Sequence, residues 1–274
     1  MNKIIICSVP KSGTYFLGQI LTRLGLRDSK IHVNLHSYTD YNGVDLDTAR
    51  HKASELRVHE PLSSSLQRIS PSEFVVGHLP VTTAPMLREF AVIFTYRNVR
   101  DILVSFCRWV AQTGRWPDDG NWRELPDGPE KLLGFLQHHG RQLRGLIDCP
   151  AGWKSQPGAT QVAFEELMGD YGADAAADAM QRIARAVGSC EHSDADLLQI
   201  LEDAKGTETI TRSGARSSRE LFWNEAVERE FVCRRFALIN QRLGFDEPSE
   251  AGWGGRWRKL RDTARKIRLP RRAA

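Results

Sequence analysis

The chain has 274 residues, 41% of them hydrophobic and 26% charged, which is typical of a globular protein with a sizeable core. It contains no run of eighteen apolar residues, so we expect no transmembrane helix, and its five scattered cysteines indicate reduced thiols rather than disulfides or a zinc site. The net charge of +4 combines a mildly acidic body with nine Lys/Arg and one Asp in residues 256–272. A nucleic-acid-binding domain would instead carry its basic residues on the fold itself.

The first predicted elements form a strand, a turn and a helix. Residues 3–8 are apolar and rich in β-branched side chains, as in a parallel strand that is buried on both faces. A turn with Pro and Gly follows at 9–14. Apolar residues then recur at helical spacing, namely Phe16, Leu17, Ile20, Leu21 and Leu24. Gly25 follows them and is a residue type that often ends a helix. This order opens an α/β fold.

The later elements continue that pattern. Residues 36–72 are polar and irregular with short helical pieces, and further strands are predicted at 74–77, 91–96 and 160–164. Asn98 is a suitable N-cap, with Asp101 completing a start that resembles a capping box. The helix after Asn98 has one apolar face, made by Val99, Ile102, Leu103, Phe106 and Val110.

The second half of the chain is mainly helical. Helical patterns run from 165 to about 242, interrupted by a loop at 206–218. The predicted fold is therefore a three-layer α/β structure, with a parallel sheet, helices on both faces and a helical C-terminal half. A change in composition near 248–255 divides the chain into one domain, 1–250, and a basic tail, 251–274, that is either amphipathic or disordered.

Two segments carry chemistry. In Val-Pro-Lys-Ser-Gly-Thr at 9–14, a turn at a helix N-terminus offers backbone N–H groups and the positive end of the helix dipole to an anion, and Lys11 adds a charge. The lysine precedes the glycine, so this is not a Walker A sequence. In Tyr-Arg-Asn-Val-Arg-Asp at 96–101, Arg97 follows a strand, where open α/β sheets bind ligands, and suits a phosphate. The structural alternatives are an ordinary turn and surface ion pairing among Arg97, Arg100 and Asp101.

Together these segments resemble the PAPS-dependent sulfotransferases, chiefly the cytosolic type. The 5'-phosphosulfate loop of that family is similar to Pro-Lys-Ser-Gly-Thr-Tyr-Phe-Leu at 10–17, and its 3'-phosphate segment is similar to residues 94–105. Further similar segments are Gly-His-Leu-Pro at 77–80, Phe-Glu-Glu-Leu at 164–167 and Thr-Arg-Ser-Gly at 211–214. The resemblance implies a P-loop NTPase-like fold.

The resemblance also implies the roles of individual residues. His78 would be the catalytic base, and Lys11 would stabilise charge that builds during transfer. The donor PAPS, released as PAP, would be held without a metal by Lys11, Ser12, Gly13, Thr14, Tyr15, Phe16, Arg97, Ser105, Phe164, Arg212, Ser213 and Gly214. A neutral imidazole is suited to taking a hydroxyl proton near neutral pH.

Two departures from the family pattern bear on this interpretation. Val76 stands where the family has a lysine, and Ser213 replaces the middle residue of an R-K-G loop. The first departure leaves open that another group is the base, with Glu55, Glu60 and Glu73 as candidates. A lone histidine at a strand end is otherwise more often structural, and Phe16 and Phe164 can equally be core residues.

Several alternatives therefore stay open. The function expected is transfer of a sulfuryl group to an acceptor hydroxyl or amine on a glycan, a lipid-linked sugar or a small alcohol or phenol. The alternatives are a P-loop kinase or NTPase and an inactive nucleotide-binding module that docks on membranes. We expect a cytoplasmic protein, with the tail in contact with the anionic inner membrane surface or disordered.

Overall fold

A computed structural model describes residues 3–114, 116, 120–208 and 219–245. It contains one seven-stranded sheet with the order β4-β3-β2-β5-β1-β6-β7. The five strands from β2 to β7 in that order run parallel, whereas β3 and β4 pair antiparallel at the edge. The strands are β1 (Lys3–Ser8), β2 (Arg27–Val33), β3 (Tyr38–Asp40), β4 (Arg57–Val58), β5 (Glu73–Gly77), β6 (Phe90–Tyr96) and β7 (Thr160–Ala163).

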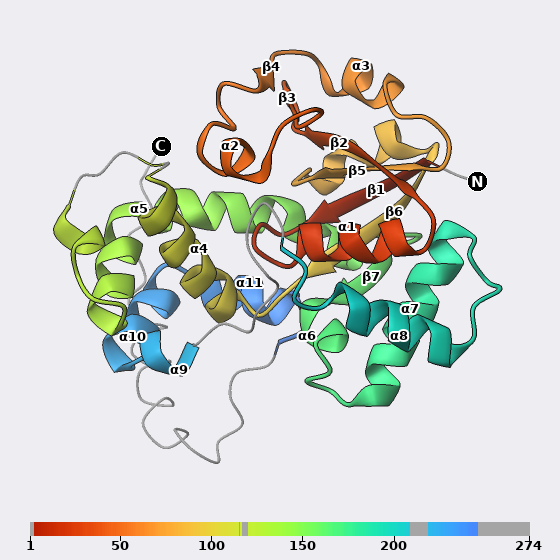
Figure 1. Cartoon of the computed structure of the whole chain (residues 1–274). Helices are drawn as coiled ribbons and strands as arrows, with labels where there is room; N and C mark the ends of the chain where they lie inside the picture. Colours follow the sequence, from red (N-terminus) through yellow and green to blue (C-terminus); the bar gives the residue numbers. More distant parts are fainter. Residues whose placement is uncertain (1–2, 115, 117–119, 209–218, 246–274) are drawn as a thin grey trace, which may run out of the picture.

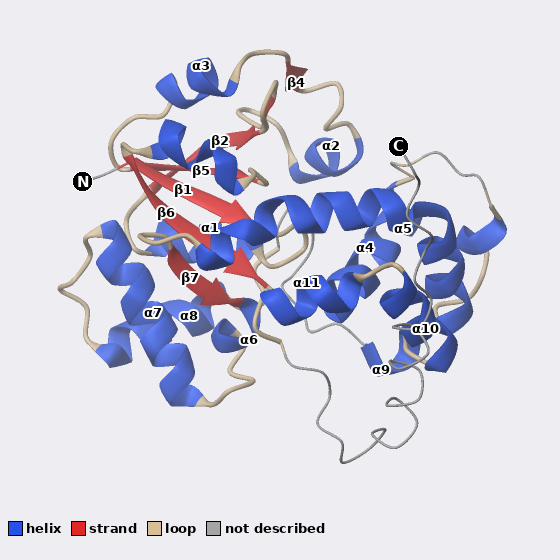
Figure 2. Ribbon diagram, turned by 180° about the vertical axis from the view of Figure 1, so that it is seen from behind, coloured by secondary structure: helices blue, strands red, loops and turns tan. Residues whose placement is uncertain are grey.

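Helices cover both faces of this sheet (Figures 1 and 2). Alternation along β1 explains the layers: Ile4 and Ile6 lie in one apolar cluster, and Ile5 and Cys7 lie in the other. The first cluster joins the sheet to α1 (Thr14–Arg23), α7 (Ala173–Val187) and α8 (Asp194–Ala204). The second joins it to α3 (Leu62–Gln67), α4 (Val99–Thr113), α5 (Pro129–Ala151), α10 (Glu225–Cys233) and α11 (Phe236–Arg242). The predicted three-layer fold is confirmed.

Two helices begin and pack as the sequence predicts. The apolar residues expected on α1 are all buried, and Gly25 follows its end with φ 88°. Asn98 caps α4 by accepting a hydrogen bond from the N–H of Arg100 at 3.0 Å, and the five residues expected on the inner face of α4 are buried. Asp101 does not complete a capping box, because the Asn98 N–H that it would bind donates to Glu165 at 2.8 Å, and the Asp101 carboxylate lies 3.7 Å from Arg219.

The region between α1 and β5 was predicted less well. The short helices expected in 36–72 are present as α2 (Leu46–His51) and α3, but three strands in this part of the chain were missed. Only three of the seven residues of β2 are buried, and β3 and β4 are three and two residues long. Strands that are this short, or as polar as β2, lack the run or alternation of apolar residues by which a strand is recognised. The segment 74–77 is therefore the fifth strand of the chain and not the second.

The remaining elements are three short 3₁₀ helices, which are Val81–Leu87, Asn121–Arg123 and Gly152–Ser155, together with α6 (Phe164–Leu167) and α9 (Arg219–Phe222). They confirm the helical second half. The basic tail and the loop residues Arg212, Ser213 and Gly214 lie outside the described residues. Within the described part of the chain, no helix has the length and apolar character needed to cross a membrane.

Candidate active site at the carboxyl ends of the strands

The turn between β1 and α1 is held against β6 by Ser12. Its hydroxyl donates to the carbonyls of Val9 and Thr95, at 2.6 and 3.0 Å, and the Thr95 hydroxyl donates back to the Ser12 carbonyl at 3.1 Å. Ser12 is fully buried. Its side chain therefore fixes the shape of the turn, and its predicted role as a direct ligand of the donor stays a prediction.

Gly13 is required by this turn for two reasons. Its φ of 87° lies in the left-handed region, which side chains disfavour, and a Cβ added there would lie 2.4 Å from the Phe164 ring. The backbone at Gly13 is thus in close contact with a buried aromatic ring just before α1 begins. The first turn of a helix leaves N–H groups without intrahelical partners, and Gly13 supplies no side-chain cap, so the start of α1 can offer these N–H groups to an anion.

His78 lies directly after β5 and beside the turn. Its Nδ1 is 2.9 Å from the Ser8 carbonyl oxygen and 2.9 Å from the Ser8 hydroxyl, which is itself 2.8 Å from the Thr14 hydroxyl. Because a carbonyl oxygen can only accept, Nδ1 carries the proton, and the lone pair of the neutral ring is on Nε2. Burial, together with the nearby charge of Lys11, lowers the pKa of His78 to about 4. The ring is therefore neutral at physiological pH.

Lys11 and Arg97 supply positive charge on two sides of the turn. The Lys11 ammonium lies 5.2 Å from the centre of the Trp109 ring, and the Arg97 guanidinium lies 4.4 Å from the centre of the Phe164 ring. Arg97 is only 7% exposed, and burial lowers the pKa of its guanidinium. Its buried Nε has no hydrogen-bond partner among the described residues. A buried donor of this kind fits an anionic ligand.

The neighbours of Arg97 do not form the surface ion pairs considered from the sequence. Arg100 makes a buried two-point pair with Glu228, at 2.9 and 2.5 Å, and Asp101 faces Arg219. Ser105 lies half-buried in α4, two turns beyond the Asn98 cap. Within the motif at 96–105, Arg100 therefore forms a buried ion pair inside the fold, whereas Arg97 keeps an Nε–H donor without a partner among the described residues.

A family model described as the sulfotransferase domain matches residues 1–140, which is more than half of the chain. The chain belongs to the sulfotransferase domain family. The resemblance noted in the sequence is thereby confirmed. A search of curated protein sequences found no match.

Solved structures share the fold of this sulfotransferase. The mouse sulfotransferase SULT7A1 complexed with PAP has a TM-score of 0.55 and 14% identity, over 89% of this chain and 88% of that chain. Retinol dehydratase in complex with androsterone and inactive cofactor PAP has a TM-score of 0.52 and 13% identity, over 90% of this chain and 82% of that chain. Retinol dehydratase in a complex with retinol and PAP has a TM-score of 0.53 and 15% identity, over 85% of this chain and 80% of that chain. These likenesses support the P-loop-like α/β fold.

Two of the three aromatic residues predicted at the donor site of this sulfotransferase, Phe16 and Phe164, lie together. Phe164 is 3% exposed and contacts the turn at Gly13, while Phe16 is 4% exposed and lies edge-on to Phe164 with the ring centres 6.0 Å apart. Both rings are core residues of the α1 layer. Tyr15 points elsewhere, because its hydroxyl lies 3.1 Å from Nδ1 of His32. Contact of these rings with adenine stays a prediction.

Glu165 is a site residue that the sequence did not single out. One of its carboxylate oxygens accepts a hydrogen bond from the Asn98 N–H at 2.8 Å, and the other is buried without a hydrogen-bond partner in the described chain. Burial is the main cause that raises the pKa of Glu165 to about 7, against the lowering effects of that N–H and of Arg97. In the sequence, Glu165 could have been recognised as a candidate because it follows the strand β7 and Phe164, and β7 lies beside β6.

The raised pKa of Glu165 predicts a pH-dependent stability. The folded carboxyl keeps its proton up to about pH 7, whereas the unfolded one loses it at an ordinary pKa of about 4.3. The stabilisation is thus full below about pH 4.3 and is lost progressively as the pH rises from there through 7. Glu165→Gln stays neutral, so its unfolding free energy relative to wild type should increase from pH 4 to pH 8 by on the order of 3 kcal/mol. Urea unfolding at both pH values measures this, and a constant difference would contradict it.

Proposed function

We propose that this sulfotransferase transfers the sulfuryl group of PAPS to an acceptor hydroxyl or amine, with His78 as the base. The observation that carries the proposal is the buried Arg97 Nε without a partner, beside the glycine turn at the start of α1. Two separate anion-binding features at the carboxyl ends of neighbouring strands fit a ligand with phosphates at both ends. PAPS has that chemistry, with a 5'-phosphosulfate and a 3'-phosphate.

The residues divide the work of the reaction. Arg97 and Ser105, with Arg212 and Gly214 by resemblance, would hold the 3'-phosphate. Lys11 and the N–H groups of the turn would hold the 5'-phosphate and stabilise the charge that develops on the leaving oxygen. His78 Nε2 carries the lone pair that would accept the proton of the acceptor hydroxyl. PAPS supplies the sulfuryl group and leaves as PAP.

The proposal assigns the charge of the donor to Lys11, Arg97 and the N–H groups of the turn, so it invokes no metal ion. Among the described residues, no group of three or more His, Cys, Asp or Glu side chains is arranged to hold a metal. A P-loop kinase would use Mg²⁺ at a strand ending in Asp, and here β6 is followed by Arg97. An inactive nucleotide-binding module would share the PAP site but would lack turnover.

Nucleotide binding tests the donor assignment. Calorimetry without magnesium should show much tighter binding of PAP than of AMP, because only PAP has the 3'-phosphate. In Arg97→Met the preference for PAP should fall, since the guanidinium is lost while the side-chain volume is largely kept. Equal affinity of the wild-type protein for PAP and AMP, or a strict need for magnesium, would overturn the assignment.

The acceptor of the sulfuryl group requires an experiment of its own. The related structures include complexes with androsterone and retinol, which are lipophilic alcohols by their chemistry. We propose a hydroxyl acceptor of a glycan, a lipid-linked sugar or a small molecule for this chain. Incubating the protein with labelled PAPS and lysate fractions, including membrane extracts, would identify the labelled product. PAP binding without any labelled product would favour the inactive module.

Contact with a membrane is a further part of this proposal. On a helix, one face of the tail would carry Trp253, Trp257, Leu260, Ala264 and Ile267, with Arg258, Arg265 and Lys266 elsewhere, a pattern suited to an anionic membrane surface. Flotation of the full chain with anionic liposomes, compared with a chain ending at Glu250, tests this contact. Equal flotation of the two would reject it.

A further inference from the structure

His32 lies against His78, although it belongs to a different strand. The two ring centres are 4.9 Å apart with the planes at 68°, an edge-to-face contact. The same His32 ring is bonded through Nδ1 to the Tyr15 hydroxyl at 3.1 Å. Tyr15 follows Thr14, whose hydroxyl is bonded to Ser8, the residue that holds Nδ1 of His78. The contacts thus form a closed ring of residues around the turn.

An irregularity in β2 brings His32 to this place. In the pairing of β2 with β5, Asp28 lies opposite Phe74 and His32 lies opposite Val76. Between these two pairs, β2 advances by four residues and β5 by only two. An uninterrupted register would place Lys30 opposite Val76. The two additional residues form a bulge, and such bulges redirect side chains next to active sites.

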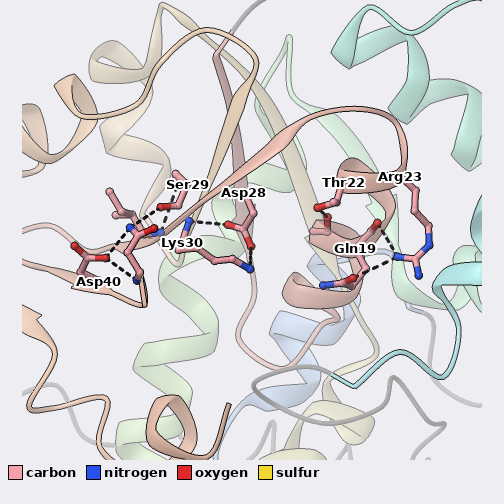
Figure 3. Close-up of polar contacts among 10 residues, drawn as sticks. Gln19, Thr22, Arg23, Asp28, Ser29, Lys30 and Asp40 are labelled. Atoms are coloured by element: carbon pink, nitrogen blue, oxygen red, sulfur yellow. Dashed lines mark hydrogen bonds and ion pairs between the residues drawn. The ribbon is translucent and has the colours of Figure 1, made fainter. Parts of the chain in front are cut away.

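The bulge is fixed by its own hydrogen bonds (Figure 3). The Lys30 N–H donates to the Asp28 carboxylate at 2.8 Å, and Lys30 has a φ of 59°. The Ser29 carbonyl accepts from the Asn42 side chain at 3.1 Å, and the Asn42 N–H donates to Asp40 at 2.9 Å. The offset that presents His32 to His78 is therefore a built feature of β2.

We propose that His32, held by Tyr15, is a positioning residue that fixes the imidazole of His78 for proton transfer. Ser8 fixes only the Nδ1 edge of the His78 ring, and a ring bound at one edge can still tilt about that bond. The imidazole of His32 packs against the His78 ring from the side of β2 and so limits this tilt. The hydrogen bond from Tyr15 in turn keeps the His32 ring from rotating. The inference rests on the proposed role of His78 as the base.

The rates of matched variants test this role. His32→Ala should lower the single-turnover rate about 10- to 100-fold, the effect of misplacing a reacting group, with PAP affinity nearly unchanged. His32→Phe keeps the ring contact but loses the bond to Tyr15, so we expect a smaller loss. Tyr15→Phe should cause the same loss as His32→Phe. The double variant with both changes should be no worse than either single variant, since all three remove the same hydrogen bond between Tyr15 and His32. His36→Ala, an exposed histidine on the loop after β2, is the control with wild-type rate.

A readout that needs no turnover separates this inference from the proposed function. In protein with ¹⁵N-labelled histidine, free and with PAP, His78 should be the Nδ1–H tautomer with a pKa near 4. His32→Ala should mix the tautomers and raise that pKa toward 6.5 as water reaches the ring beside Lys11 and Ser8. A wild-type rate and an unchanged His78 spectrum in His32→Ala would overturn the proposal. So would a rate loss matched by equal losses of PAP affinity and thermal stability. If the wild-type protein transfers no sulfuryl group, the proposed function fails, and the spectra alone decide the role of His32.

Discussion

His78→Ala is expected to lower the rate of sulfuryl transfer about 10²- to 10⁴-fold, the usual cost of losing a general base. In the proposed mechanism the proton acceptor is the Nε2 lone pair of His78, which the bond of Nδ1 to Ser8 leaves available. PAP affinity should be nearly unchanged, because the neutral ring carries no charge to attract the phosphates. Single-turnover rates and calorimetry on the variant measure the two effects separately.

Lys11→Ala is the matched comparison for this prediction. In the proposed mechanism the Lys11 ammonium contacts the donor before and during transfer, so the loss should appear in both PAP affinity and rate. Thermal melts of both variants show whether the fold is kept. A His78→Ala rate above about a tenth of wild type would contradict the prediction, since base removal costs more than that.

The structure also bears on the alternative bases suggested by the sequence. Glu73 starts β5, at the strand end away from His78, and its carboxylate binds Arg27 and the Ser70 N–H. Glu60 is paired with Arg68 at 3.1 Å. Glu55 is exposed near β4. Their positions favour His78 as the base.

Glu228→Ala is expected to reduce the unfolding free energy by about 3–5 kcal/mol, the cost of leaving one member of a buried ion pair alone. Arg100 and Glu228 are 6% and 8% exposed, and the Glu228 carboxylate also accepts from the Trp223 indole at 2.6 Å. Removing this carboxylate leaves a buried guanidinium that lies over the Phe231 and Trp223 rings without its anionic partner. Urea unfolding of the variant and the wild-type protein measures the difference.

Two further variants define this effect. Replacing both members, as Arg100→Met with Glu228→Leu, should restore most of the lost stability, because no charge is then buried. Glu202→Ala removes an exposed ion pair with Lys205 and should change stability by less than about 1 kcal/mol. A loss for Glu228→Ala no larger than that for Glu202→Ala would show that the pair does not stabilise the fold.

The parts of the fold that could be predicted are those with strong periodicity. The strand β1 is a continuous buried run, and in α1 and α4 the buried positions repeat at helical spacing, with Asn98 at the start of α4 and Gly25 after α1. The strand β2 gives only a weak signal, because its buried positions alternate but just two of them, Ile31 and Val33, are apolar, and its other residues are polar. A pattern along the chain does not reveal an offset of two residues between neighbouring strands.

The candidate site was predictable where its residues are adjacent in sequence. The turn at 9–14, His78 and Arg97 each belong to a short segment that reports its own chemistry. Glu165 and His32 have roles that depend on partners far along the chain: Glu165 binds the Asn98 N–H, and His32 packs on His78. Such pairs follow from the order of the strands in the sheet, which the separate segments do not determine.

The start of α4 is secured from three later parts of the chain, and this has a consequence for the order of folding. Glu165 binds the N–H of Asn98, Asn240 accepts from the N–H of Val99 at 2.8 Å, and Glu228 pairs with Arg100. During synthesis, residues 1–140 emerge first, yet they lack all three partners. The glycine turn can therefore form early, whereas the Arg97 side of the donor site is completed only after α11 has left the ribosome. A nascent chain would hold the nucleotide at one end before it could hold both.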